Sequence, residues 1–177
     1  CYRSTKTLPG VVAEIQQVFA ERPEQDYQII LVNDCSPDDT YDTICELCEQ
    51  DKKIVGVNLS RNYGQACARM AALPFVKGDC AVCMDDDGQH PAEGMFALIE
   101  KIQEGYDMVY AHFGHKKHSL FKRITSRMFG KLMEEFGVRP KGIQMSSFFA
   151  WSRFAMEELK KYHSPTPTDV SYLMKVT

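Results

Sequence analysis

The chain has 177 residues, of which 44% are apolar and 25% are charged, so it can bury one sizeable core and we expect a single domain. Its formal net charge of −3 provides no overall attraction to nucleic acid or to an anionic membrane. No apolar run approaches the ~20 residues that cross a bilayer, and no signal-peptide pattern opens the chain.

Helical and strand-like patterns alternate along the first 111 residues. Apolar residues at helical spacing predict helices over 8–22, 36–50, 63–76 and 91–105. Short apolar runs predict buried strands over 27–34, 53–60, 79–84 and 106–111. After these come an amphipathic helix over 115–137, a strand over 143–152 and a helix over 153–162. This alternation favours an α/β sandwich with a mostly parallel central sheet flanked by helices.

Seven cysteines include two C-x-x-C pairs, which could indicate zinc. Cys45 and Cys48 lie in a predicted helix, whereas Cys80 and Cys83 lie in a predicted strand, where residues three apart point to opposite faces. Neither pair has the glycine-containing turn of a zinc knuckle. We therefore interpret the cysteines as small core residues of a protein in a reducing cytoplasm.

Polar residues follow three of the predicted strands at the point where each strand ends. They occupy 33–39, 60–65 and 85–90. Each could be an ordinary loop with a helix cap, but in open parallel sheets ligands bind beyond the carboxyl ends of the strands. Because all three are expected at that edge, the sequence predicts a ligand site there.

Three adjacent aspartates, Asp85, Asp86 and Asp87, follow the strand over 79–84. In a solvated turn they could splay apart. On an extended turn, however, Asp85 and Asp87 point the same way, and a hard divalent cation would cancel their repulsion. Magnesium keeps positions for water and substrate phosphates, so two carboxylates predict a metal–diphosphate site.

The motifs "NDCSPDDT", "LSRNYGQACARMAAL", "GDCAVCMDDDGQHPAE" and "GYDMVYA", followed by "HKKHSLFKRITSRMF", resemble the inverting family 2 glycosyltransferases of GT-A fold. The members that load a sugar onto a polyprenyl phosphate are most similar, and the resemblance thins after Met128. It implies one Rossmann-like catalytic domain over 1–177, with a nucleotide-sugar-binding half (1–111) and an acceptor-side half (112–177). In that family "C-Y-x-S" follows an apolar strand, so the first strand is expected before Cys1.

The resemblance also implies roles for individual residues. Asp34 would contact the nucleoside of a UDP- or GDP-linked sugar, and Gln89 would join the metal ligands. The implied donor-binding residues are Tyr2, Asp34, Arg61, Gln65, Asp85 and Asp86. The implied ligands of Mg²⁺ or Mn²⁺ are Asp85, Asp87 and Gln89. The chain departs from the family at Arg3, where Asn is frequent, and at Gly88, where Leu is frequent.

The basic helix predicted over 115–137 carries an apolar stripe of Leu120, Ile124 and Met128. It could be a solvated surface helix that docks by this stripe. Alternatively it is an acceptor segment that binds a lipid phosphate at the membrane surface. The implied acceptor-binding residues are His118, Ser119, Arg123, Ser126 and Arg127. This interpretation places the domain in the cytoplasm at the inner face of the membrane.

The acceptor decides the mechanism. A phosphate monoester is already ionised near neutral pH, so it needs positioning more than deprotonation. The expected reaction is one in-line displacement that inverts the anomeric carbon, with Asp85 and Asp87 as catalytic residues. If the acceptor is a glycan hydroxyl, Asp169 is the candidate base, although it could equally cap a helix. Ser146 and Ser147 are candidates for the acceptor cleft.

Three alternatives remain at this stage. The run "MDDDGQ" also fits most of the D-x-D-G motif of haloacid-dehalogenase-like phosphatases, in which an aspartate is the nucleophile. That family places the motif at its first strand, whereas here two strand–helix units precede it. A nucleotidyltransferase and a non-catalytic nucleotide-binding module are the other two.

Overall fold

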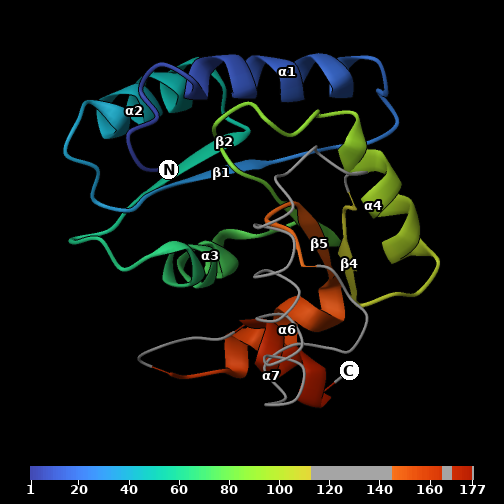
Figure 1. The fold of residues 1–177 in the computed structure, drawn as a ribbon. Coiled ribbons are helices and arrows are strands. Elements are labelled where there is room, and N and C mark those ends of the chain that lie inside the picture. Colours follow the sequence, from blue (N-terminus) through green and yellow to red (C-terminus); the bar gives the residue numbers. More distant parts are fainter. Residues whose placement is uncertain (113–144, 165–168, 177) are drawn as a thin grey trace, which may run out of the picture.

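The structure, a computed structural model, describes residues 1–112, 145–164 and 169–176 (Figure 1). The elements are α1 (Leu8–Ala20), β1 (Ile29–Asn33), α2 (Thr40–Gln50), β2 (Ile54–Asn58), α3 (Gln65–Ala72), the 3₁₀ turn η1 (Leu73–Phe75), β3 (Cys80–Cys83), α4 (Gly94–Gln103), β4 (Met108–Tyr110), β5 (Phe149–Ser152), α6 (Arg153–Lys161) and α7 (Asp169–Val176). They confirm the predicted order of helices and strands up to α6, except that the helix predicted over 115–137 lies outside the described residues; α7 was not predicted. In the described part, no helix has the length and apolar character needed to cross a membrane.

Strands β1 and β2 form a parallel pair, in register from Ile29 opposite Ile54 to Asn33 opposite Asn58. Cys1 forms backbone hydrogen bonds with the edge of β1 that does not face β2. The amino group of Cys1 donates to the carbonyl of Val32 at 2.6 Å, and the N–H of Asp34 donates to the carbonyl of Cys1 at 3.0 Å. This is the hydrogen-bond pattern of a parallel bridge, so Cys1 extends the sheet beside β1.

Strand β5 lies between β3 and β4 and is antiparallel to both. The expected sheet was mostly parallel, so this direction differs from the expectation. Tyr110 at the end of β4 is paired with Phe149 at the start of β5. The chain therefore leaves β4 and returns to β5 at the same edge, which makes the pair antiparallel. A run of apolar residues predicts a strand but contains no information about its direction.

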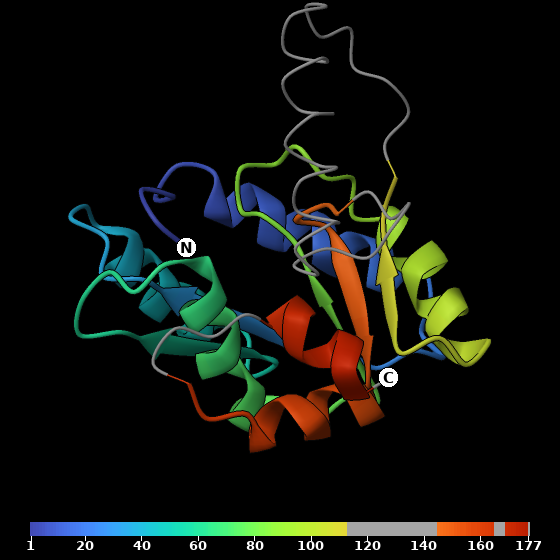
Figure 2. The same cartoon turned by 60° about the horizontal axis from the view of Figure 1, so that its bottom comes forward.

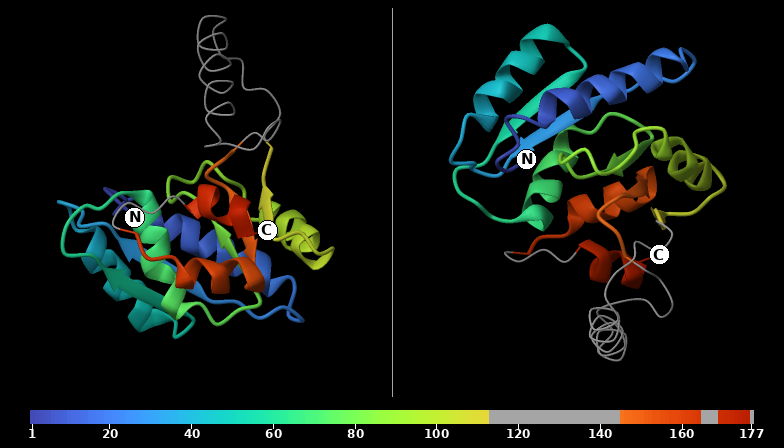
Figure 3. Two further views of the ribbon diagram at one scale, coloured as in Figure 1. Left: turned by 90° about the horizontal axis from the view of Figure 1, so that it is seen from below. Right: turned by 45° about the horizontal axis from the view of Figure 1, so that its top comes forward.

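The strands form a two-stranded sheet, β1–β2, and a three-stranded sheet, β3–β5–β4, and two hydrophobic cores lie on opposite faces of the three-stranded sheet. Helices α1, α2 and α4 pack into one core, while η1, α6 and α7 build the other, against which α3 also packs (Figure 2). In β5, Ala150 faces the first core, whereas Phe149 and Trp151 face the second. Because both faces of the sheet are covered, this strand is wholly apolar up to Ser152. Figure 3 views the molecule toward α3, α6 and α7 in one panel and toward α1 and α2 in the other.

Local signals explain where several helices begin and end. Asp38 precedes α2, and its carboxylate accepts from the N–H and hydroxyl of Thr40 at 3.3 and 2.6 Å. Gly105, with φ of +104°, ends α4 in the left-handed conformation expected of a C-cap glycine. The helix predicted over 91–105 begins only at Gly94. The N–H of Gly94 bonds to the carbonyl of Pro91, so residues 91–94 form a turn that precedes α4.

Gly56 in β2 has no room for a side chain. A Cβ atom there would lie 2.7 Å from Cγ2 of Ile44 and 3.3 Å from Sγ of Cys48, both on α2. We expect Gly56→Ala to lower the free energy of unfolding by about 1–3 kcal/mol, as overpacked cores do. Gly10→Ala in α1 is the matched control, since its Cβ would meet nothing within 4 Å. The control should be neutral or stabilising by about 0.5 kcal/mol. Urea unfolding measures both variants, and an equal loss of unfolding free energy in Gly56→Ala and Gly10→Ala would contradict the prediction.

Candidate active site

The carboxyl ends of β1, β2 and β3 meet at one edge of the fold. Asp34 follows β1, and its two carboxylate oxygens accept from the N–H groups of Tyr63 and Gly64, beyond β2, at 2.7 and 2.8 Å. Gln65 Nε2 lies 3.4 Å from Oδ1 of Asp85, beyond β3. These contacts confirm that the three predicted polar segments share an edge.

Asp34 is 6% exposed, and its observed role is to anchor the loop between β2 and α3. The carboxylate holds that loop at Gly64, which has φ of +86° and precedes α3. Arg61 stacks on Tyr63 in the same loop, with its guanidinium carbon 4.6 Å from the ring centroid. Hydrogen bonding from Ser60 lowers the pKa of Tyr63, and the Arg61 charge adds to this shift. A contact between Asp34 and a nucleoside stays a prediction.

Two non-glycine residues beside Asp34 have left-handed backbone conformations, Arg3 with φ of 57° and Cys35 with φ of 51°. The N–H of Arg3 donates to Oγ of Ser36 at 2.8 Å, which joins the two segments. Asn tolerates this conformation better than Arg does. The departure at Arg3 therefore carries a conformational cost at the edge of the site, next to the exposed ring of Tyr2.

The acidic motif after β3 holds its three aspartates in different surroundings. Asp85 accepts a hydrogen bond from the hydroxyl of Ser147 at 2.5 Å. Asp86 Oδ2 is buried with no hydrogen-bond partner among the described residues, and lies 3.8 Å from the amino group of Cys1. Asp87 is exposed and accepts from the N–H of Gln89 at 2.9 Å. Gly88, between Asp87 and Gln89, has φ of +72°, so any residue with a side chain would be strained at this position.

The donor set of this motif fits a hard divalent cation. Carboxylate oxygens of Asp85 and Asp87 and the side-chain amide oxygen of Gln89 are the oxygen ligands that Mg²⁺ and Mn²⁺ prefer. Within the described residues, no three His, Cys, Asp or Glu side chains are grouped so that they could hold a metal ion. Two carboxylates and one amide oxygen leave coordination positions for water and substrate oxygens, as Mg²⁺ sites commonly do.

A cavity of about 230 Å³ opens beside Asp85. It is lined by Gln65, Arg69, Tyr110, Met145, Ser146, Ser147 and Phe149. The sequence reasoning named Gln65, Ser146 and Ser147 but missed Arg69. The available signal was its position one helical turn after Gln65, on the same face of α3.

Arg69 binds Asp169, the first residue of α7, with Nε and Nη2 at 2.7 and 2.6 Å from Oδ2. The Asp169 side chain is 5% exposed. Burial raises the pKa of Tyr110 nearby, and the Asp169 charge adds to this shift. Asp169 thus begins a helix and forms a buried ion pair, while its role as a base stays a prediction.

The predicted acceptor residues, His118, Ser119, Arg123, Ser126 and Arg127, lie outside the described residues. The chain on either side of them is described. The N–H of Ala111, after β4, donates to the carbonyl of Phe148, before β5, at 2.9 Å. Both flanks therefore lie at the edge where Ser147 contacts Asp85.

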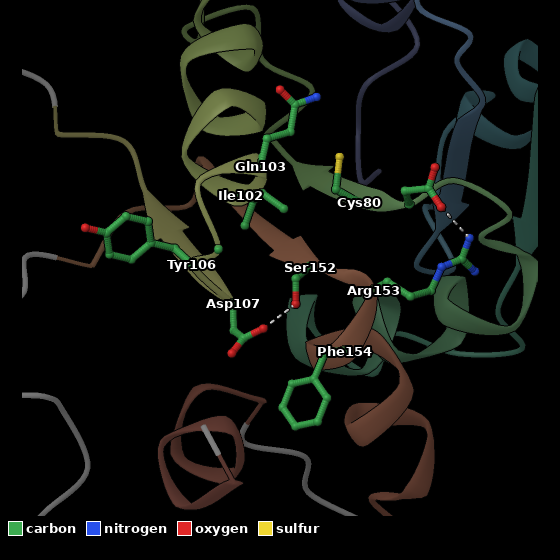
Figure 4. Close-up of a pocket in the computed structure, with 10 residues that line it drawn as sticks. Cys80, Ile102, Gln103, Tyr106, Asp107, Ser152, Arg153 and Phe154 are labelled. Atoms are coloured by element: carbon green, nitrogen blue, oxygen red, sulfur yellow. Dashed lines mark hydrogen bonds and ion pairs between the residues drawn. The ribbon is translucent and has the colours of Figure 1, made fainter.

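A larger cavity of about 340 Å³ lies at the opposite end of the same strands (Figure 4). Asp107 accepts from the hydroxyl of Ser152 at 2.6 Å, and Arg153 pairs with Asp79 at 3.1 Å. Each of these charged groups thus has a partner, Arg153 with Asp79 and Asp107 with the Ser152 hydroxyl. None of the predicted site residues lines this cavity.

The fold and site define an α/β domain with an acidic, oxygen-rich ligand edge at the carboxyl ends of its strands. The model of Glycosyl transferase family 2 matches residues 1–160, and the chain belongs to that family. The family match therefore favours a glycosyltransferase over the haloacid-dehalogenase-like phosphatase alternative.

Curated relatives share the match over most of this chain. It is 31% identical over 163 residues to the undecaprenyl-phosphate 4-deoxy-4-formamido-L-arabinose transferase of Klebsiella pneumoniae, covering 92% of this chain and 50% of the relative. It is 32% identical over 148 residues to the enzyme of the same name from Shewanella sediminis, and the match covers 83% of this chain and 43% of that relative. The chain thus spans about half the length of these relatives.

Solved structures share the GT-A fold. Glucosyl-3-phosphoglycerate synthase from Mycobacterium tuberculosis, in complex with Mn²⁺, UDP-glucose and phosphoglyceric acid, matches with a TM-score of 0.62 at 20% identity, over 89% of this chain and 56% of that one. A mannosyltransferase from Pyrobaculum calidifontis, in complex with GDP-Man and Mn²⁺, matches with a TM-score of 0.61 at 19% identity. This match covers 96% of this chain and 46% of that one.

Proposed function

We propose that this chain forms the catalytic domain of a glycosyltransferase that moves a sugar from a nucleoside-diphosphate sugar to a polyprenyl phosphate, with inversion. The observation that carries the proposal is the acidic motif of Asp85 and Asp87 at the carboxyl edge of β3, beside the loop that Asp34 anchors. In this arrangement a nucleoside lies near Asp34 and Tyr2, with Asp85 toward the ribose or the metal, while the diphosphate lies near Asp87 and Arg61.

A divalent cation, Mg²⁺ or Mn²⁺, held by Asp85, Asp87 and Gln89, would neutralise charge on the departing diphosphate. The Mn²⁺ complexes of the two similar structures support a cation of this kind. Exposed Asp87 contributes a carboxylate to the cation, and Arg61 adds a positive charge at the same edge.

The names of the curated relatives support a polyprenyl phosphate as the acceptor. An acceptor phosphate oxygen would attack the anomeric carbon while the bond to the diphosphate breaks and its electron pair leaves with the nucleoside diphosphate. No proton needs to be removed, because the phosphate is already ionised. The contact of Asp169 with Arg69 agrees with this, since that carboxylate already serves an ion pair. With a lipid acceptor, the reaction takes place at the cytoplasmic face of a membrane.

The proposal predicts metal-dependent binding of one nucleoside diphosphate. At about 100 times its dissociation constant, UDP or GDP with Mn²⁺ should stabilise the folded chain by about 2.7 kcal/mol. For this chain length that raises Tm by roughly 5–11 °C. Thermal melts with each nucleotide, and with Mn²⁺, Mg²⁺ or chelator, measure the effect. Chelator should abolish it, and a cooperative melt that neither nucleotide shifts would contradict the proposed function.

A further inference from the structure

The geometry points to Ser147 as a positioning residue: its hydroxyl holds the Asp85 carboxylate in the orientation that receives the cation and diphosphate. This inference rests on the proposed function, and it gives Ser147 a role that acts through Asp85. Ser147 lies between the predicted acceptor segment and β5, 62 residues from Asp85.

The contact between the two side chains is short. Ser147 Oγ donates to Oδ2 of Asp85 at 2.5 Å, the distance of a strong hydroxyl–carboxylate hydrogen bond. On the other oxygen, Nε2 of Gln65 lies 3.4 Å from Oδ1, a much longer contact. Ser147 is therefore the closer of these two donors, and its loss should free the Asp85 side chain to rotate.

The backbone around Ser147 is itself fixed. Phe148 is 1% exposed, and its ring stacks on His90 of the acidic motif with centroids 5.1 Å apart. The N–H of Phe148 donates to Oγ of Ser146 at 3.0 Å, and its carbonyl accepts from Ala111. A hydroxyl on so constrained a segment can orient a metal-binding carboxylate, as groups hydrogen-bonded to metal ligands commonly do.

Binding of Mn²⁺ to the full chain tests the inference without measuring turnover. The free Mn²⁺ signal is followed by electron paramagnetic resonance, with Mn²⁺ alone and with UDP or GDP. We expect Ser147→Ala to raise the dissociation constant about 10-fold, the lower end of the range for such partners. Ser147→Thr keeps the hydroxyl and should restore affinity to within roughly threefold of the unsubstituted chain.

Ser152→Ala is the matched control. It breaks a similar hydroxyl–carboxylate bond, to Asp107 at 2.6 Å, at the far end of β5, and also removes the cap of α6. This variant should lower Tm but leave Mn²⁺ affinity unchanged. If it weakens Mn²⁺ binding as much as Ser147→Ala, the effect is general destabilisation and the inference is wrong.

Two further outcomes separate the inference from the proposed function. Unchanged affinity in Ser147→Ala, with binding by the unsubstituted chain, overturns the role of Ser147 and leaves the proposed function standing. If the unsubstituted chain binds no Mn²⁺, alone or with either nucleotide, both are overturned.

Discussion

Asp87→Asn should abolish the metal-dependent stabilisation by a nucleoside diphosphate and lower sugar transfer roughly 1,000-fold. Asp87 is the exposed carboxylate of the motif, and its contact within the chain is an N–H bond from Gln89. Asn keeps the shape but removes the charge that attracts a cation. Losing several kcal/mol of charge stabilisation corresponds to about a thousandfold in rate. Thermal melts and single-turnover transfer from a labelled nucleotide sugar measure the two effects.

Asp26→Asn is the control for this prediction. Asp26 is an exposed carboxylate just before β1, at the end of that strand opposite Asp34, and it pairs with Lys53 at 2.7 Å. Its substitution removes the same charge from the protein at a distance from the proposed site. Equal losses in Asp26→Asn and Asp87→Asn would mean that net charge, rather than the acidic motif, governs nucleotide binding.

Arg69→Met should lower the free energy of unfolding by about 3 kcal/mol, because it deprives the buried Asp169 carboxylate of its counter-charge. For a chain of this size the loss corresponds to a Tm roughly 6–12 °C lower. The double variant Arg69→Met, Asp169→Leu should recover most of it, since an apolar pair often replaces a buried ion pair without cost. Urea unfolding of the three proteins measures these differences.

Arg153→Met provides the comparison for an exposed ion pair. Arg153 binds Asp79 at 3.1 Å, but both side chains are well exposed, at 47% and 102%. Solvent screens such pairs, so unfolding should change little. The prediction for Arg69 is wrong if both single variants lose equal stability, or if the double variant is no more stable than Arg69→Met.

The sequence alone predicts most of the described helices and strands, and it predicts that three polar segments share one edge of the fold. Apolar spacing places β1, α2 and β2 within a few residues of their observed bounds, because buried faces require that periodicity. Polar residues at the ends of three strands predict the ligand edge, and the adjacent aspartates predict the cation. These are local signals, since each depends on neighbours within one turn or one strand.

Contacts between distant segments could not be predicted in this way. The oxygens of Asp34 hold the loop at Tyr63 and Gly64, a contact that no local pattern predicts, while its contact with a nucleoside stays a prediction. Arg69 and Asp169 are 100 residues apart and meet because α3 and α7 both pack against the second core. No spacing rule joins such residues, because packing of the second core determines where the helices lie.

The sequence by itself predicts which residues are proposed as oxygen ligands, indicates where most of the described strands and helices lie, and carries the family resemblance. The tertiary structure alone decided the antiparallel direction of β5 and, with it, the position of Ser147 against Asp85. The physical reason is that strand direction depends on the edge at which the returning chain re-enters the sheet. Periodicity along a strand is the same in either direction, so only the folded chain reveals which side chains meet.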